Sequence, residues 1–235
     1  MKTIASTALP AHVQQPRYDR EQLHSRIVHF GFGAFHRAHQ ALLTNRVLNA
    51  KGGDWGICEI SLFSGDVLMG QLRAQDHLFT VLEKGAEGNQ PIIIGAVKEC
   101  LNAKLDSLAA IIEKFCEPQV AIVSLTITEK GYCIDPATGK LDMRNSRILH
   151  DLEHPSEPHS APGILVEALH RRRERGLPAF TVLSCDNIPD NGHVVKNAVL
   201  GMAGKRSAEL AAWIEAHVSF PGTMVDRIVP AATDA

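Results

Sequence analysis

Short apolar runs alternate along this chain with stretches in which apolar residues recur every three or four positions. The runs predict buried strands at residues 26–31, 55–63, 120–127 and 180–184. The periodic stretches predict helices at about residues 35–49, 66–74, 104–115, 164–175, 192–203 and 207–217. Strands that alternate with helices favour an α/β fold built on a doubly wound, mostly parallel sheet.

Some segments depart from this alternation. Residues 77–84 and 91–99 predict two strands around a glycine-containing turn, which is typical of a β-hairpin inserted into the sheet. Residues 1–25 are expected to form an extended lead-in, and 220–230 a last strand or extended segment. The polar, proline-containing stretch at 128–162 is long enough to predict a functional loop or a lid.

Two polar clusters have simple interpretations. The run RRRER at 171–175 predicts a solvated face near a helix C-terminus, where positive charge is favourable. His150, His154 and His159 invite a metal site, but no predicted helix or strand holds their spacing and no thiol joins them. We therefore predict no metal ligands in this chain.

The segment 26–43 predicts a strand, a glycine turn and a helix in that order, with the sequence RIVHFGFGAFHRAHQALL. Gly31 would let the backbone turn sharply off the strand, and Gly33 has no side chain to block a pyrophosphate. The first N–H groups of the following helix would point at that phosphate. The full dinucleotide fingerprint has a third glycine, where this chain has His36. By spacing alone, a glycine turn that binds no ligand is equally compatible.

The residues around this turn are the candidates for binding a dinucleotide. Arg37 would complement a phosphate with paired N–H donors. The predicted cofactor-binding residues are Ile27, Val28, His29, Phe30, Gly31, Phe32, Gly33, Ala34, Phe35, His36, Arg37 and Ala38.

Ligands of such sheets bind beyond the carboxyl ends of the strands. An acidic residue after the second strand normally bonds the adenosine ribose, and Asp66 is the preferred candidate. Its carboxylate would repel a 2′-phosphate, which favours NAD over NADP. The simpler role for Asp66 is a helix N-cap, and the two roles are compatible. Glu59 is nearer to the glycines but lies inside the predicted strand, and Thr126 at the end of the third is also assigned to the cofactor.

Two further polar residues are candidates for catalysis. Asn187 follows the strand at 180–184, where its amide could stabilise an oxyanion that develops on a carbonyl substrate. An Asx turn ahead of Pro189 is the structural alternative. Asp226 and Arg227 lie in the otherwise apolar run VDRIV, as a buried ion pair or as part of a site.

Composition narrows the class of protein. The net charge of −2 gives no indication of the excess of positive charge that is typical of nucleic-acid-binding proteins. No apolar run approaches the ~20 residues that a membrane span needs, and the N-terminal residues lack the apolar core of a signal peptide. The five cysteines are widely spaced without a CxxC pair, which suits reduced thiols. We therefore expect a cytoplasmic protein with neither a nucleic-acid nor a membrane partner.

Four segments together resemble one family. GFGAFHRAHQ is similar to the nucleotide-binding signature of the polyol-specific long-chain dehydrogenases, the mannitol dehydrogenase family. TEKGY, SCDNIPDNG and MVDRIVP are similar to three further signatures, in the same order and spacing. Within the family, the chain looks most like the D-mannonate oxidoreductases, or fructuronate reductases.

The resemblance implies an NAD-dependent, metal-independent interconversion of a secondary alcohol and a ketone in a sugar acid or polyol. For the nearest subgroup these are D-mannonate and D-fructuronate, a step of hexuronate catabolism. It also implies an N-terminal Rossmann-like domain, here 26–235, and a helical C-terminal domain. In this comparison the glycine turn binds the pyrophosphate, Asp66 lies near the ribose, Asn187 belongs to the oxyanion hole, and Asp226 lies close to the active centre.

One signature of the family has no counterpart in these residues. The family's catalytic base is a lysine in a Lys-x4-Asn-x2-His motif of the C-terminal domain, and no such motif occurs in this chain. We therefore expect the chain to be the cofactor-binding part, with the C-terminal helical domain absent. The alternatives are an NAD-binding fragment without catalysis, a mannitol or other polyol 2-dehydrogenase, and an S-adenosylmethionine-dependent methyltransferase.

Overall fold

The computed structural model describes residues 8–62, 64–86, 88–226 and 228–229. The chain divides into two compact units. Unit 1 comprises residues 1–106 with 228–235, and unit 2 comprises residues 107–227.

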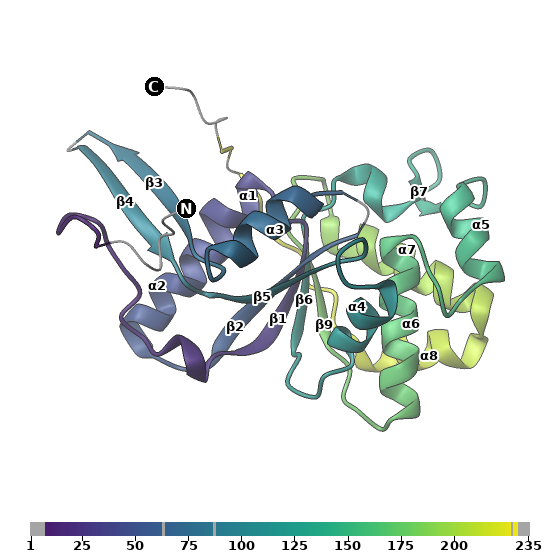
Figure 1. Ribbon diagram of the computed structural model, residues 1–235. Coiled ribbons are helices and arrows are strands. Elements are labelled where there is room, and N and C mark those ends of the chain that lie inside the picture. The colour runs from purple at the N-terminus through teal and green to yellow at the C-terminus, as the bar shows by residue number, and fades with distance from the viewer. Residues whose placement is uncertain (1–7, 63, 87, 227, 230–235) are drawn as a thin grey trace. The chain divides into compact units, whose positions relative to one another are not determined.

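Unit 1 is built on three parallel strands (Figure 1). The central strand, β2, pairs with β1 on one side and with β5 on the other. Nearly every residue of β1 and β2 after the first is buried, as expected for interior strands of a parallel sheet. The bounds are His24–Phe30 for β1, Trp55–Ser61 for β2 and Val97–Asn102 for β5.

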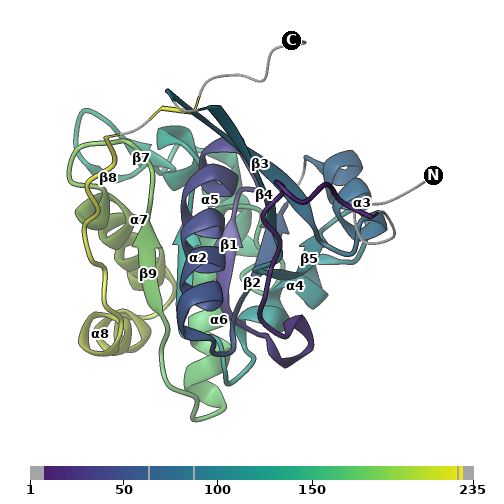
Figure 2. The ribbon, with the colours of Figure 1, turned by 90° about the vertical axis from the view of Figure 1, so that its left-hand side faces the viewer.

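The glycine turn after β1 leads into one continuous helical segment. It begins as α1 (Ala34–His36), passes through a π-helical turn, η3 (Arg37–Ala41), and continues as α2 (Leu42–Lys51). Gly52 ends it with a positive φ of 69°. A second helix, α3 (Asp66–Ala74), follows β2. Figure 2 shows α2 in front of β1 and β2, and α2 packs against β2.

The predicted hairpin is present, but its second strand ends earlier than predicted. Strands β3 (Phe79–Gly85) and β4 (Gly88–Ile94) are antiparallel, and residues 97–99 of the predicted strand belong to β5. The break is at Gly95, where an added Cβ would lie 2.7 Å from Pro16 and 3.0 Å from Arg20. Residues of the N-terminal lead-in therefore pack directly against the backbone at Gly95.

The lead-in is also more structured than an extended segment. Gln14 forms a parallel bridge with Ile92 of the hairpin. A short 3-10 helix, η2, covers Arg20–Gln22, and Asp19 caps it by accepting from the N–H of Glu21.

Unit 2 contains two parallel strands with helices around them (Figure 1). Strand β6 (Ile122–Leu125) pairs in register with β9 (Thr181–Ser184). The helices are α4 (Leu108–Phe115), α5 (Ser146–Glu153), α6 (Ala161–Glu174), α7 (Asn191–Arg206) and α8 (Ala208–His217). Four of these helices agree with the predicted periodic stretches, and α5 was not predicted. Among the described residues of 220–230 there is no strand.

The polar stretch at 128–162 is not one loop. It holds the 3-10 helix η4 (Glu129–Tyr132), a small hairpin of β7 (Ile134–Asp135) and β8 (Lys140–Leu141), and α5. The buried carboxylate of Asp151 accepts hydrogen bonds from the backbone N–H groups of His159 and Ser160, at 2.6 and 2.9 Å. The stretch is therefore a series of short, anchored elements, and its role as a functional loop or a lid stays a prediction.

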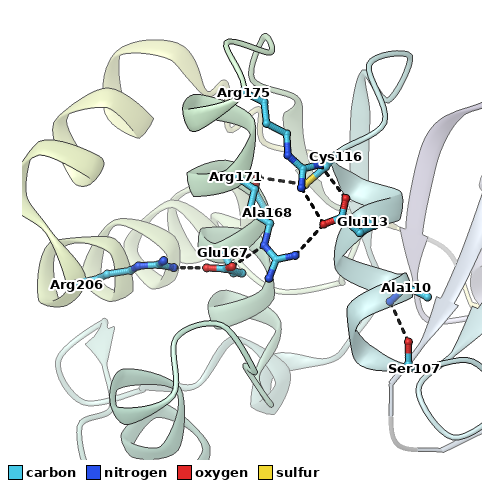
Figure 3. A network of polar contacts seen from close by, with 9 residues as sticks. All are labelled: Ser107, Ala110, Glu113, Cys116, Glu167, Ala168, Arg171, Arg175 and Arg206. Carbon is cyan, nitrogen blue, oxygen red and sulfur yellow. Dashed lines mark hydrogen bonds and ion pairs between the residues drawn. The ribbon is translucent and has the colours of Figure 1, made fainter.

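The arginine run at the end of α6 is only partly solvated. Arg171 and Arg175 donate to Glu113 of α4, and Glu167 of α6 accepts from Arg171 and Arg206 (Figure 3). These pairs join α4, α6 and α7 at the surface of unit 2.

Arg172, in the middle of that run, is fully buried, which corrects the prediction of a solvated face. Its guanidinium lies 5.4 Å from the ring centre of Phe180. It donates to four backbone carbonyls, those of Phe115, Glu117, Val120 and Pro178. The side chain therefore joins the end of α4, the turn before β6 and the segment before β9 through their backbone carbonyls.

Candidate functional site

Two glycines shape the turn after β1, and only one of them is required by its backbone. Gly31 has a φ of 106°, a region that side chains with a Cβ rarely adopt. Its N–H donates to the carbonyl of Ile60 in β2 at 3.0 Å, which ties the turn to the neighbouring strand. Its own carbonyl accepts from the N–H of Gly33 at 2.8 Å.

Gly33 has an ordinary backbone conformation, with φ −80° and ψ 170°, so the fold itself does not demand a glycine there. It is exposed, and a Cβ added to it would meet nothing within 4 Å. Gly33 is also the N-cap of α1, and no side chain caps this helix. The first helical bond joins the N–H of Arg37 to its carbonyl. The open surface at Gly33 therefore lies at an uncapped helix N-terminus, where an anion is favoured.

Aromatic and cationic side chains lie beside this turn. Arg37 is half-buried, its Nε lies 3.4 Å from the carbonyl oxygen of Gly33, and its guanidinium lies 5.3 Å from the ring centre of Phe32. Phe35 stacks on His39 with 4.2 Å between ring centres. The positive charge of Arg37 is thus held at the turn, where a phosphate would bind.

The other predicted cofactor residues divide by burial. Ala34 is exposed and Ala38 is half-buried, so both are accessible at the start of the helix. Six side chains belong to the core: Ile27, Val28, His29, Phe30, Phe32 and His36. These six can serve a ligand through their backbone or through their packing, and not by side-chain contact.

Beneath the turn lies a buried polar cluster. His29 of β1 and Glu59 of β2 are neighbours in the strand register, and His36 comes from α1. The imidazoles of His29 and His36 stack with 3.5 Å between centres, and Nε2 of His36 lies 2.6 Å from Oε1 of Glu59. Nε2 of His29 lies 3.0 Å from the carbonyl oxygen of Gly31. The cluster thus joins the turn, the helix and β2.

Burial sets the protonation of this cluster. It raises the pKa of Glu59 to about 7 and lowers the pKa of both His29 and His36 to about 3. Both imidazoles are therefore neutral at neutral pH. Glu59 is unavailable to a ribose, as its place inside the strand predicts.

Asp66 is the first residue of α3, and the N-cap is Gly65 with a φ of 74°. The alternative that Asp66 is the N-cap is therefore wrong. Its Oδ1 lies 2.9 Å from Nζ of Lys104, and this hydrogen bond lowers the pKa of Asp66. Both side chains are accessible, so the carboxylate is available to a ligand but shares its position with a cation.

In unit 2, one aspartate joins the two segments that follow β6 and β9. Asp186 accepts hydrogen bonds from the N–H groups of Ile127 and Thr128, at 3.0 and 2.9 Å. It also accepts from the hydroxyl of Tyr132 at 2.6 Å. Sequence reasoning missed Asp186. Its place inside the motif SCDN, directly after a predicted strand, is the signal that could have identified it.

The remaining predicted residues of unit 2 are accessible to different extents. Thr126 is half-buried directly after β6, and Asn187 is exposed between β9 and α7. Asp226 is exposed, which corrects the alternative of a buried ion pair, and Arg227 lies outside the described residues. A second asparagine, Asn191, holds this region by donating to the carbonyl of Asp186 at 3.1 Å.

The three histidines that invited a metal site lie near one another at the edge of α5. The ring of His150 is stacked on that of His159 with 3.8 Å between centres, and it is tilted by 45° against the ring of His154 at 4.9 Å. The stacked pair does not aim its nitrogens at a common point, so this pair is aromatic packing.

A comparison with known proteins identifies the family. The model of the mannitol dehydrogenase Rossmann domain matches residues 25–235. The chain belongs to the mannitol dehydrogenase family. The family and the Rossmann-like, mostly parallel fold predicted from the sequence are thereby confirmed.

Individual members of the mannitol dehydrogenase family are closely similar. The uncharacterized oxidoreductase YeiQ of Escherichia coli (strain K12) is 86% identical over 234 residues, which cover 100% of this chain and 48% of YeiQ. The D-mannonate oxidoreductase of the same organism is 57% identical, over 99% of this chain and 48% of the relative. The structure of Pseudomonas fluorescens mannitol 2-dehydrogenase, a ternary complex with NAD and D-mannitol, matches at a TM-score of 0.91 and 45% identity, over 96% and 46% of the two chains.

The chain spans about half the length of these relatives. Within the described residues, no helix is long and apolar enough to cross a membrane.

Proposed function

We propose that this chain binds NAD(H) at the glycine turn, as the cofactor-binding part of an oxidoreductase that acts on the CH–OH group of a polyol or sugar acid. The observation that carries the proposal is Gly33. Neither its backbone conformation nor a neighbouring protein atom requires a glycine at this position. The glycine nevertheless lies at the uncapped start of a helix. A ligand that approaches this backbone explains the residue, and a pyrophosphate suits the helix terminus.

Each predicted cofactor residue then has a role that its position allows. The N–H groups of the first helical turn and the guanidinium of Arg37 meet the pyrophosphate. Asp66 bonds the adenosine ribose and disfavours a 2′-phosphate, a preference that Lys104 at 2.9 Å moderates. Thr126, directly after β6, is half-buried and is proposed as a further cofactor contact.

For the substrate we propose D-mannonate and D-fructuronate. The D-mannonate oxidoreductase of Escherichia coli is 57% identical to this chain, whereas the mannitol 2-dehydrogenase of known structure is 45% identical. Mannitol or another polyol is the alternative. Asn187 would donate its amide N–H to the substrate oxygen as negative charge develops there. Asp226 would lie close to the reacting centre. The cofactor supplies the acceptor or donor of the hydride.

A group that moves the hydroxyl proton is still needed, and the Lys-x4-Asn-x2-His motif does not occur among these 235 residues. We therefore expect the isolated chain to bind NADH without useful turnover of D-fructuronate, since positioned acid–base groups contribute ~10²–10⁴-fold. The proposed location is the cytoplasm, which agrees with five free cysteines.

Equilibrium titration tests this function. NADH fluorescence should be enhanced on binding, and S-adenosylmethionine should neither bind nor compete. Binding of S-adenosylmethionine without binding of NADH would assign the glycine turn to a methyltransferase instead. An NADH oxidation assay with D-fructuronate completes the test. Turnover of ~1–10³ per second would show a catalytic base within this chain, with Lys130 and Lys196 the first residues to replace.

A further inference from the structure

The buried cluster beside the glycine turn has a role that dinucleotide binding alone does not assign. His29, His36 and Glu59 are each at most 1% exposed. They contact the three parts that form the turn. His29 bonds the carbonyl of Gly31, His36 is part of the first helical turn, and Glu59 belongs to β2.

The cluster occupies the place of the missing third glycine. In the dinucleotide fingerprint, that glycine lets the helix pack closely on the strands. Here the position is His36, whose ring is stacked on His29 and bonded to Glu59. The spacing between helix and sheet is thus set by a hydrogen-bonded imidazole rather than by the absence of a side chain.

These three groups could also be read as metal ligands, since one ligating atom of each lies within 4.8 Å of the others. The geometry of the rings argues against this. The two imidazoles are nearly parallel, at 16°, with 3.5 Å between centres, so their in-plane lone pairs run side by side and do not converge on one ion. The 2.6 Å contact between His36 and Glu59 is instead the length of a strong hydrogen bond.

That hydrogen bond needs one proton between two acceptors. Glu59 is its source in the neutral form, because burial raises the pKa of the carboxyl and lowers that of the imidazole. The second carboxyl oxygen, Oε2, is buried and has no hydrogen-bond partner among the described residues. An ionised carboxylate with such an oxygen would be costly, whereas a neutral acid tolerates it.

We propose that His36 and Glu59 are positioning residues of the dinucleotide site, and that the site binds the dinucleotide with the shared proton of this pair in place. The inference rests on the proposed function. While the proton is present, the pair is neutral and fixes the start of the helix against β2. When the proton leaves, one negative charge remains beside the helix terminus that must accept the pyrophosphate, and binding weakens.

The groups named below face Glu59, and none of them accounts for a change of charge near neutral pH. His29 of β1 is neutral because burial lowers its pKa to about 3, and burial raises the pKa of the Cys100 thiol on β5. The helical segment contributes the guanidinium of Arg37 and the amide of Gln40, which does not titrate. The pair itself is therefore the group in this cluster that releases a proton near neutral pH.

The test is an NADH fluorescence titration between about pH 6 and pH 8.5 on three proteins: wild type, Glu59→Gln and His39→Gln. For wild type we expect the Kd to rise about three- to tenfold over this range, as for a pKa that binding raises by up to about one unit. Glu59→Gln keeps a donor to His36 and cannot ionise, so its Kd should be independent of pH. His39→Gln removes an accessible imidazole from the same helical segment and should keep the rise.

Four results would overturn the inference. A wild-type Kd that does not change with pH would overturn it while leaving the proposed function intact. A rise with pH in folded Glu59→Gln equal to that of wild type would show that another group titrates. If Glu59→Gln does not fold, ¹³C NMR of wild type decides instead. The Glu59 carboxyl should titrate near pH 7 and higher with NADH, and titration at an ordinary glutamate pKa would refute it. Absence of NADH binding at every pH overturns the proposed function and this inference with it.

Discussion

Replacing Arg172 with methionine should cost unit 2 a large part of its stability. Methionine keeps an unbranched apolar stem but removes the guanidinium, which is fully buried among backbone carbonyls. The lost hydrogen bonds are those to Pro178 at 2.7 Å, Phe115 at 2.8 Å, Glu117 at 2.9 Å and Val120 at 3.2 Å. The contact with the ring of Phe180 is lost as well.

The magnitude follows from competing terms. A hydrogen bond to a charged group contributes about 1.5–3 kcal/mol, and the four bonds here share one side chain, so their contributions do not add. The cost of burying the guanidinium offsets part of the gain and disappears in the variant. These carbonyls lose the guanidinium as donor, although that of Glu117 keeps the N–H of Val120, and we expect a net loss of about 3–5 kcal/mol in the free energy of unfolding.

The neighbouring Arg173→Met is the matched control. Arg173 is partly exposed, and its ion pair with Glu209 is long, at 3.6 Å. An accessible pair of this kind contributes about 0–1 kcal/mol. Urea unfolding followed by circular dichroism should separate the two variants clearly. A loss below about 1 kcal/mol for Arg172→Met, with an unchanged dependence on urea, would refute the assignment of Arg172 as the donor that these carbonyls need.

Three further predictions concern the site. Asp66→Ala should narrow the preference for NADH over NADPH and Lys104→Ala should widen it, as competitive titration would show, and tighter binding of NADPH by wild type would remove Asp66 from the ribose site. Asp186→Ala should lower the free energy of unfolding by about 2–4 kcal/mol, because the N–H groups of Ile127 and Thr128 and the hydroxyl of Tyr132 lose the carboxylate as acceptor, and a change under 1 kcal/mol in urea unfolding would contradict this role. The pKa of Glu59 is raised above its ordinary 4.5 to about 7, so the folded chain holds a proton that the unfolded chain releases, and this contribution is complete below pH 4.5 and lost as pH rises through 7. The free energy of unfolding of Glu59→Gln relative to wild type should therefore increase between about pH 5 and 7 by up to about 1.4 kcal/mol per pH unit, and a constant difference would mean that Glu59 is ionised throughout.

Local patterns were sufficient for the elements whose burial follows from their own residues. The apolar run before Gly31 forms β1, which is buried at nearly every position, and the periodic stretch after Gly33 forms a helix whose buried residues recur every three positions. The ordered motifs after β1, β6 and β9 were sufficient to identify the family.

Features that depend on distant partners could not be read in this way. The hairpin strand ends at Gly95 because Pro16 and Arg20, far away in the sequence, pack against it. Arg172 is buried because four carbonyls surround it, although its neighbours in the sequence are solvated. The pair of His36 and Glu59 depends on the register that places β2 beside β1, which the alternation of residues does not specify.

The most direct test of dinucleotide binding at the turn is an NADH titration of Gly33→Val beside Gly204→Val. Both glycines have open space where a Cβ would be, and Gly204 lies in α7, outside the turn. We expect Gly33→Val to abolish NADH binding while circular dichroism shows a folded chain, because the branched side chain occupies the path of the pyrophosphate. Gly204→Val should bind as wild type does. Undiminished NADH binding by folded Gly33→Val would contradict the assignment of the cofactor to this turn.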